Sequence, residues 1–223
     1  MPFRNTLEYA QKLDADDQLG KYRDEFYFPK VDGKQVIYFT GNSLGLQPKR
    51  TQKFVDEVMT DWKELAVEGH FHSEKPWWDY HERLAEPLAK IVGAKTEEVS
   101  VMNTLTVNLH FLMVSFYRPT SKRYKIICEE KAFPSDQYMF QSQVKFHGLN
   151  PEDAIVEVKK RAGEHFWRTE DIVAKINEVG EELALVLIGG VNYYSGQVFD
   201  LETITKAGKF VGANVGWDLA HAA

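Results

Sequence analysis

Short apolar blocks alternate with longer mixed segments along the second half of this chain, which predicts buried strands separated by amphipathic helices. Strands are expected at 124–129, 154–158, 183–188 and 213–217, and helices at 104–117, 135–146, 169–179 and 201–211. Thr169 is expected to cap its helix. Apolar strands joined by helices are typical of a parallel sheet covered on both faces. The pattern therefore predicts an α/β fold with a mainly parallel sheet and helices on both faces.

The first half of the chain is less regular. Its pattern predicts helices at 6–19, 48–67 and 79–92 and strands at 36–40 and 99–102. Pro48 suits the first turn of its helix, because an N–H group there would be unpaired anyway. The two longer helices carry apolar stripes, so each is predicted to bury one face. The stripes consist of Phe54, Val55, Val58, Met59, Trp62 and Leu65 in one helix and of Leu84, Leu88 and Ile91 in the other.

Composition narrows the class of protein. The chain has 223 residues, of which 43% are hydrophobic and 27% charged, as is ordinary for a globular protein. Its formal net charge of -6 argues against a protein that grips a nucleic-acid backbone. Its longest apolar stretch, 183–191, is too short to span a bilayer, and no secretory signal is visible. The single cysteine, Cys128, fits a reducing compartment, so we expect a soluble, cytoplasmic protein.

The last residues of the chain follow directly on the strand expected at 213–217. A strand edge with no following helix is a poor place for a domain to end. We therefore expect this chain to be a truncated part of a longer protein.

Functional groups of an open parallel sheet collect where its strands end, and two such positions suit parts of a phosphorylated aromatic ligand. At 103–106, the free N–H groups of a helix start suit a phosphate. Side-chain capping by Asn103 or Thr104 is the alternative explanation. At 133–136, the ring of Phe133 can stack on a pyridine ring. The alternative here is an aromatic core residue followed by Ser135 as a helix cap.

A third strand end carries Asp218 and, three residues later, His221. A carboxylate at this place can keep a ring nitrogen protonated, as pyridoxal 5'-phosphate (PLP) requires. A helix cap, a core hydrogen bond or a metal pair would explain the same two residues. Because the three positions would converge on one edge of the sheet, together they favour a PLP site.

Four runs of residues carry a resemblance to a known family. The runs 41–48 (GNSLGLQP), 102–110 (MNTLTVNLH), 132–136 (AFPSD) and 218–222 (DLAHA) resemble kynureninase, a PLP enzyme. The similarity extends from about residue 22 to the end. It implies an aspartate-aminotransferase-like fold (PLP fold type I), here truncated. Residues 1–65 would be an N-terminal segment contributing to the small domain and the active-site edge, and 66–223 a partial large PLP-binding domain.

The resemblance also implies roles for individual residues. Leu105 and Thr106 would bind the cofactor phosphate. Phe133 would stack on the ring, Asp136 would hydrogen-bond around it, and Asp218 would pair with the ring nitrogen. The complete set of implied contacts comprises Leu105, Thr106, Phe133, Pro134, Ser135, Asp136, Asp218 and His221 for the cofactor and Ser43 and His70 for the substrate. Gly189 stands where relatives often have a serine, so that contact is expected to be lost or taken over by water.

By resemblance, the whole enzyme is a homodimer that hydrolyses L-kynurenine or 3-hydroxykynurenine to anthranilate, or its hydroxy form, and L-alanine. This reaction belongs to tryptophan degradation and NAD precursor supply. The lysine that would form a Schiff base with PLP is expected beyond Ala223, so we expect no catalytic residue within the chain. No nucleic-acid or membrane partner is expected.

Some alternatives stay open at this point. Another fold-type-I activity, such as a cysteine desulfurase or an aminotransferase, would use the same architecture, and a non-catalytic α/β interaction domain would keep these residues for structure alone. The His70-Phe71-His72 spacing could suit two metal ligands, but no cysteine or acid cluster lies nearby, so no metal is expected. The run 193–196 (YYSG) could line the site or form an ordinary turn.

Overall fold

A computed structural model describes residues 3–223 of the chain. The chain divides into two compact units, an N-terminal unit, Met1–Tyr80, and a sheet unit, His81–Ala223. Within residues 3–223, every helix is too short or too polar to serve as a membrane span.

The N-terminal unit consists of short elements with little buried surface. Its elements are α1 (Leu7–Asp16), the 3₁₀ helix η1 (Gly20–Glu25), the strands β1 (Lys30–Val31) and β2 (Lys34–Gln35), α2 (Thr51–Leu65), η2 (Ala66–Glu68) and α3 (Gly69–His72). α1 begins at the cap Thr6, whose side chain accepts a hydrogen bond from the Tyr9 N–H. Among its described residues, only Gly69 and Ser73 are buried. The apolar stripe of α2 is largely exposed, with Trp62 at 63%.

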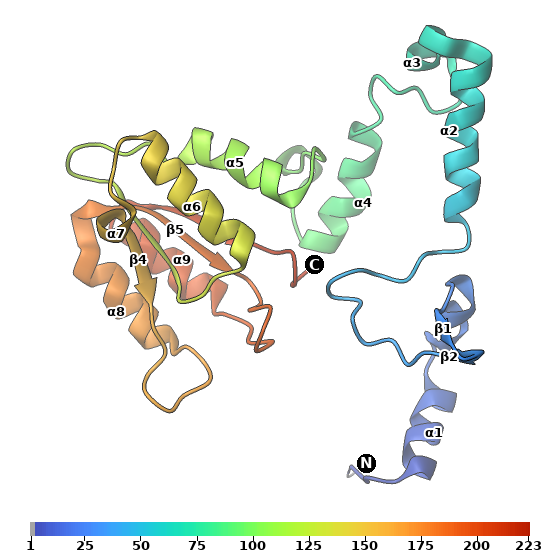
Figure 1. Ribbon diagram of the computed structural model, residues 1–223, viewed down its shortest axis with the longest axis horizontal. Coiled ribbons are helices and arrows are strands. Elements are labelled where there is room, and N and C mark those ends of the chain that lie inside the picture. The colour runs from blue at the N-terminus through green and yellow to red at the C-terminus, as the bar shows by residue number, and fades with distance from the viewer. Residues whose placement is uncertain (1–2) are drawn as a thin grey trace. The chain divides into compact units, whose positions relative to one another are not determined.

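Besides the burial of the α2 stripe, two further predictions for this unit are wrong. Residues 36–40 form no strand, and the chain turns earlier, in the hairpin β1–β2 (Figure 1). Asp32 and Gly33 form its two-residue turn with φ of 49° and 75°, the left-handed pair that closes a tight hairpin. Pro48 is not the first residue of a helix either, because it bridges to Phe26 and α2 begins at Thr51.

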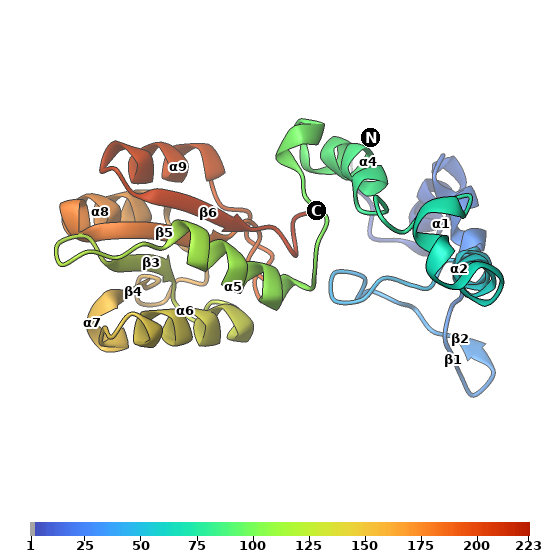
Figure 2. The same ribbon diagram turned by 90° about the horizontal axis from the view of Figure 1, so that it is seen from above.

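The sheet unit has the predicted α/β architecture. Four parallel strands lie in the order β4-β3-β5-β6, and their bounds are β3 (Lys125–Glu129), β4 (Ile155–Val158), β5 (Leu183–Gly189) and β6 (Asn214–Asp218). The helices are α4 (Glu82–Val92), η3 (Thr96–Glu98), α5 (Leu105–Phe116), α6 (Pro134–Phe146), α7 (Pro151–Ala154), α8 (Thr169–Val179), η4 (Gly180–Glu182) and α9 (Leu201–Phe210). α5, α6 and α7 cover one face of the sheet, and α8 and α9 cover the other (Figure 2).

Each face of this sheet has its own hydrophobic core. On the α5–α6 face, Met113, Met139 and Phe140 pack with strand residues in one buried cluster. On the α8–α9 face, Ile172, Ile176 and Ile204 belong to the second cluster. Burying apolar side chains from both faces of the strands stabilises the sheet and fixes where its strands end.

Three predictions in this unit are wrong in detail. Residues 99–102 form no strand. Thr169 is the first residue of α8, and Arg168 occupies the cap position. In α4 the residues buried are Ala85 and Ala89, whereas Leu84 and Ile91 of the predicted stripe are exposed. Periodicity shows which residues share a helix face, but it does not show whether anything covers that face.

Candidate active site

Three acidic side chains are buried where the carboxyl ends of the strands meet α6. Glu129 is the last residue of β3, Asp218 is the last residue of β6, and Asp136 lies in the first turn of α6. Their exposed fractions are 4%, 8% and 4%. In the described part of the chain, no lysine or arginine forms an ion pair with any of them. Buried acids without a cation are costly, so this edge of the sheet suits a positively charged group.

The carboxyl group of Asp136 lies next to that of Asp218. Burial raises the pKa of Asp136 to about 7, and the negative charge of Asp218 adds to this rise. Ser135 Oγ donates a hydrogen bond to Asp136 Oδ1 at 3.1 Å. Asp136 can therefore hold a proton near neutral pH, or give it up when a cationic ligand lies beside the two carboxyl groups.

Asp218 is also held by its own backbone environment. Its Oδ1 accepts a hydrogen bond from the Ala220 N–H at 2.8 Å, and its carbonyl oxygen accepts one from the Gly190 N–H at 2.7 Å. Burial raises the pKa of Glu129 as well, and its Oε1 accepts a hydrogen bond from the Gly189 N–H at 3.3 Å. All three acids are thus anchored to the ends of strands or to a helix start.

Aromatic rings lie beside the acid pair. Phe133 occupies the N-cap position of α6, and the residue is 39% exposed. Tyr193 meets it edge to face with ring centroids 5.1 Å apart, and the His221 ring lies 6.2 Å from it. His221 Nδ1 is buried without a hydrogen-bond partner. Phe133 is therefore not a core residue, and its ring is available to a planar ligand.

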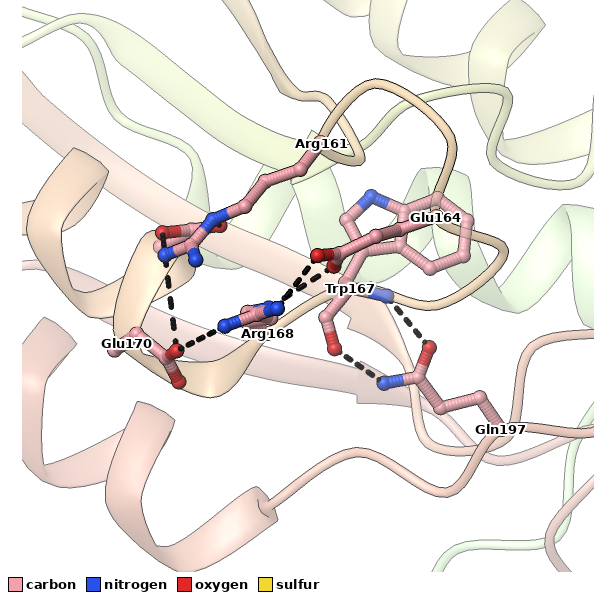
Figure 3. A network of polar contacts seen from close by, with 7 residues as sticks. Arg161, Glu164, Trp167, Arg168, Glu170 and Gln197 are labelled. Carbon is pink, nitrogen blue, oxygen red and sulfur yellow. Dashed lines mark hydrogen bonds and ion pairs between the residues drawn. The ribbon is translucent and has the colours of Figure 1, made fainter.

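The loop that carries Tyr193 is tightly ordered. Asn192 is buried, and its Oδ1 accepts hydrogen bonds from the N–H groups of Tyr194 and Ser195. Gln197 then ties this loop to the one before α8 (Figure 3). Its side-chain amide donates to the Trp167 carbonyl at 2.7 Å and accepts from the Trp167 N–H at 2.9 Å. The run 193–196 therefore forms a turn and also places a ring at the site.

Arginine side chains brace the loop before α8 (Figure 3). Arg168 donates two hydrogen bonds to the carboxylate of Glu164, at 2.9 and 2.6 Å. Arg161 binds the carboxylate of Asp171 in the same two-pronged way, at 2.7 and 2.6 Å. These contacts hold the loop that carries Trp167 in place. Because Gln197 bonds to Trp167, they also stabilise the loop that carries Tyr193.

The start of α5 has the features of an anion site. Thr104 occupies the cap position, but its side chain accepts no hydrogen bond from the helix. Asn108 holds the preceding turn instead, because its side chain accepts from the Asn103 N–H and donates to the Asn103 carbonyl. Side-chain capping by Thr104 is therefore not the explanation of this motif. The N–H groups at the helix start, where Leu105 and Thr106 lie, are available to a phosphate.

The predicted site residues fall into three groups. Phe133, Asp136, Asp218 and His221 lie together, with Pro134 and Ser135 in the same turn of α6. Leu105 and Thr106 lie in the first turn of α5, which packs against α6. Ser43 and His70 belong to the N-terminal unit, where the His70 ring contacts Trp77 at 5.3 Å and His70 Nδ1 lies 2.9 Å from the Val67 carbonyl.

Sequence reasoning missed Glu129. It follows the apolar run Ile126-Ile127-Cys128 in a strand predicted to be buried. An acid that ends a buried strand is rarely buried without a role, and that was the available signal. Among the described residues, no group of three or more histidine, cysteine, aspartate or glutamate side chains is arranged to hold a metal ion.

Solved structures share this fold. The chain is similar to a C-DES variant whose PLP cofactor carries covalently linked glycine, with a TM-score of 0.61 and 14% identity over 92% of this chain and 49% of that one. It is also similar to the cysteine desulfurase of Thermococcus onnurineus, with a TM-score of 0.60 and 20% identity over 97% and 48%. At these identities the likeness shows the fold alone, which is that of PLP fold-type-I enzymes.

Curated protein sequences are far more similar to this chain than the solved structures are. The kynureninase of Flavobacterium johnsoniae is 74% identical over 223 residues, which are 100% of this chain and 52% of that protein. The kynureninases of Myxococcus xanthus and Nematostella vectensis are 54% and 52% identical, over 99% and 96% of this chain and 52% and 49% of theirs. No family model matches the chain. The chain is therefore homologous to kynureninases along its whole length, and it spans about half the length of the curated relatives that it matches.

Proposed function

We propose that this chain forms the cofactor-binding part of a PLP-dependent hydrolase that cleaves the Cβ–Cγ bond of L-kynurenine or 3-hydroxykynurenine. With one water consumed, the products are anthranilate, or 3-hydroxyanthranilate, and L-alanine. The observation that carries this proposal is the identity of 74% with a kynureninase over all 223 residues. The buried acid pair supports it independently, because it suits a cation and the described part of the chain places no lysine or arginine in an ion pair with it.

The residues present fit PLP. A protonated ring nitrogen is a cation of the kind that Asp218, with Asp136 beside it, can stabilise. The exposed ring of Phe133 offers a surface for stacking, and the uncapped start of α5 offers N–H groups to a phosphate. When bound, PLP supplies an electron sink for charge that develops on the amino-acid substrate.

Each proposed site residue then has a defined role. Asp218 keeps the proton on the ring nitrogen, and Asp136 supports it from the adjacent position. Leu105 and Thr106 hold the phosphate with their N–H groups, and Phe133 fixes the plane of the ring. Pro134 and Ser135 shape the turn that presents Phe133 and Asp136, and His221 lies at the edge of the ring. Ser43 and His70 contact the substrate.

Other features of the whole enzyme also belong to this proposal. They are a Schiff-base lysine outside these 223 residues, a homodimer and a cytoplasmic location. The division of the chain into a segment 1–65 and a PLP-binding part 66–223 is proposed on the same basis, from the family resemblance. The single cysteine, Cys128, which is buried, is compatible with a reducing compartment.

The test uses the full-length protein supplied with PLP. It should release anthranilate and alanine in equal amounts from kynurenine without any keto acid. An aminotransferase would require a keto acid, and a cysteine desulfurase would release sulfur from cysteine and leave kynurenine intact. A protein that binds no PLP would support a non-catalytic domain and would refute the proposal.

A further inference from the structure

The peptide groups at the end of β5 are hydrogen-bonded on both sides. In a parallel sheet, successive N–H groups of one strand point to opposite neighbours. The Gly190 N–H points toward β6 and donates to the Asp218 carbonyl at 2.7 Å. The Gly189 N–H points toward β3. The last residues that pair between β3 and β5 are Ile127 and Val186, so no backbone carbonyl of β3 pairs with Gly189. There the side chain of Glu129 accepts its hydrogen bond at 3.3 Å.

The space around Gly189 is shaped for this contact. A Cβ atom on Gly189 would lie 3.3 Å from Glu129 Oε1 and 3.4 Å from the Val191 carbonyl oxygen. The carboxyl group of Glu129 thus lies close to the place that a side chain on Gly189 would occupy. Gly189 pairs directly with Asp218 in the register of β5 and β6. Glu129 therefore holds the backbone of Gly189, the residue that pairs with Asp218 across β5 and β6.

We propose that Glu129 is a positioning residue for Asp218. From β3 its carboxyl group fixes the Gly189 peptide, and the next peptide fixes the backbone of Asp218. The side chain of Asp218 then reaches the cofactor from a strand end that cannot shift. This inference rests on the proposed function, because the ring nitrogen of PLP is what Asp218 is held to meet.

Two substitutions separate hydrogen bonding from mere filling of space. Glu129→Gln keeps the length of the side chain and an oxygen that accepts from the Gly189 N–H. Glu129→Leu keeps most of the volume but accepts nothing. The matched control is Glu130→Gln, because Glu130 is the next residue and its partner is Lys160, at 3.7 Å, in a partly exposed ion pair.

Two readouts are measured on the full-length protein. The first is the dissociation constant of PLP, from titration of its visible absorption. The second is hydrogen exchange of the Gly189 N–H in the cofactor-free protein, by NMR. We expect Glu129→Leu to weaken PLP binding about tenfold and to speed this exchange about tenfold, as loss of one hydrogen bond to a buried carboxyl group implies. Glu129→Gln and Glu130→Gln should stay within about twofold of the unchanged protein in both.

The outcomes are distinct. A Glu129→Leu protein that matches the unchanged protein in both readouts overturns the inference, as does a Glu129→Gln protein that is as impaired as Glu129→Leu. If Glu129→Leu does not fold, Gly189→Ala tests the same contact from the other side, since its Cβ would lie only 3.3 Å from Glu129 Oε1 and would press on that carboxyl group. Gly189→Ala with unchanged PLP affinity and unchanged protection of its N–H would then overturn the inference. If the unchanged protein binds no PLP, the proposed function fails, and the exchange measurement alone decides whether Glu129 holds this strand end.

Discussion

The carboxyl groups of Asp136 at the start of α6 and Asp218 at the end of β6 lie next to each other in a buried position, and this arrangement raises the pKa of Asp136. The two residues are 82 positions apart in the numbering. The fold brings them together because the carboxyl ends of β3 and β6 lie at the same edge of the sheet. Without a cationic ligand, this pair makes the stability of the protein depend on pH.

The first prediction concerns this pH dependence. The pKa of Asp136 rises from 3.8 to about 7 on folding, first because of burial and then because of Asp218. The folded protein therefore binds this proton more tightly than the unfolded chain does. The stabilising contribution is complete below about pH 4 and is lost as the pH rises to about 7. We expect Asp136 to lower the free energy of unfolding by about 1–3 kcal/mol between pH 5 and pH 8.

Urea denaturation of the cofactor-free protein at pH 5 and pH 8 measures this effect. Asp136→Asn cannot ionise, so the loss between the two pH values should be smaller in that variant by the amount given above. Carboxyl groups far from Asp136 titrate equally in both proteins and cancel in the comparison. Identical pH slopes for the two proteins would contradict the prediction.

The second prediction concerns catalysis by the full-length enzyme. Asp218→Ala removes the carboxylate that keeps the ring nitrogen protonated, so the chemical step should slow far more than cofactor binding weakens. We expect turnover of kynurenine to fall at least about a hundredfold, while the affinity for PLP falls about tenfold or less. Glu157→Gln, an exposed acid in β4, serves as the control. Near-normal turnover of Asp218→Ala would rule out the assigned role.

The third prediction concerns Tyr193, whose ring meets Phe133 edge to face at 5.1 Å. Such a pair contributes about 0.5–1.5 kcal/mol and limits rotation of the Phe133 ring. Tyr193→Ala should therefore weaken PLP binding about threefold to tenfold, whereas Tyr193→Phe keeps the ring and should bind normally. Tyr194→Ala is the matched control, because Tyr194 lies in the same turn with 90% of its surface exposed. Equal affinities for Tyr193→Ala and Tyr194→Ala would show that the ring pair has no role.

The sheet unit was predictable because its strands are apolar on both faces and its helices are periodic. The strand predicted at 124–129 is β3, and the helix predicted at 135–146 is α6, each within one residue at either end. The N-terminal unit buries few side chains, so its apolar residues do not mark a core. At 36–40 the apolar run predicts a strand, although Asp32-Gly33 just before it is the stronger local signal, for a tight hairpin.

The site was predictable in part. Motifs at strand ends located Phe133, Asp136, Asp218 and His221, and the structure brings these four together. Glu129 was missed, because its importance depends on the N–H of Gly189 in a neighbouring strand, 60 positions later. Sequence spacing does not show which backbone group at the edge of a sheet lacks an acceptor. That information comes only from the register of the strands.

The last prediction concerns the contact between α9 and β6, the strand that ends in Asp218. Gly208 is buried in α9, and a Cβ atom there would lie 2.5 Å from Cγ2 of Val215 in β6. Gly208→Ala would normally favour a helix, but here the added methyl group must push α9 away from the sheet. We expect it to lower the free energy of unfolding by about 1–3 kcal/mol in urea denaturation. Lys209→Ala, one position later and exposed, should change it by less than about 0.5 kcal/mol. A Gly208→Ala protein more stable than the unchanged protein would mean that α9 does not approach β6 this closely.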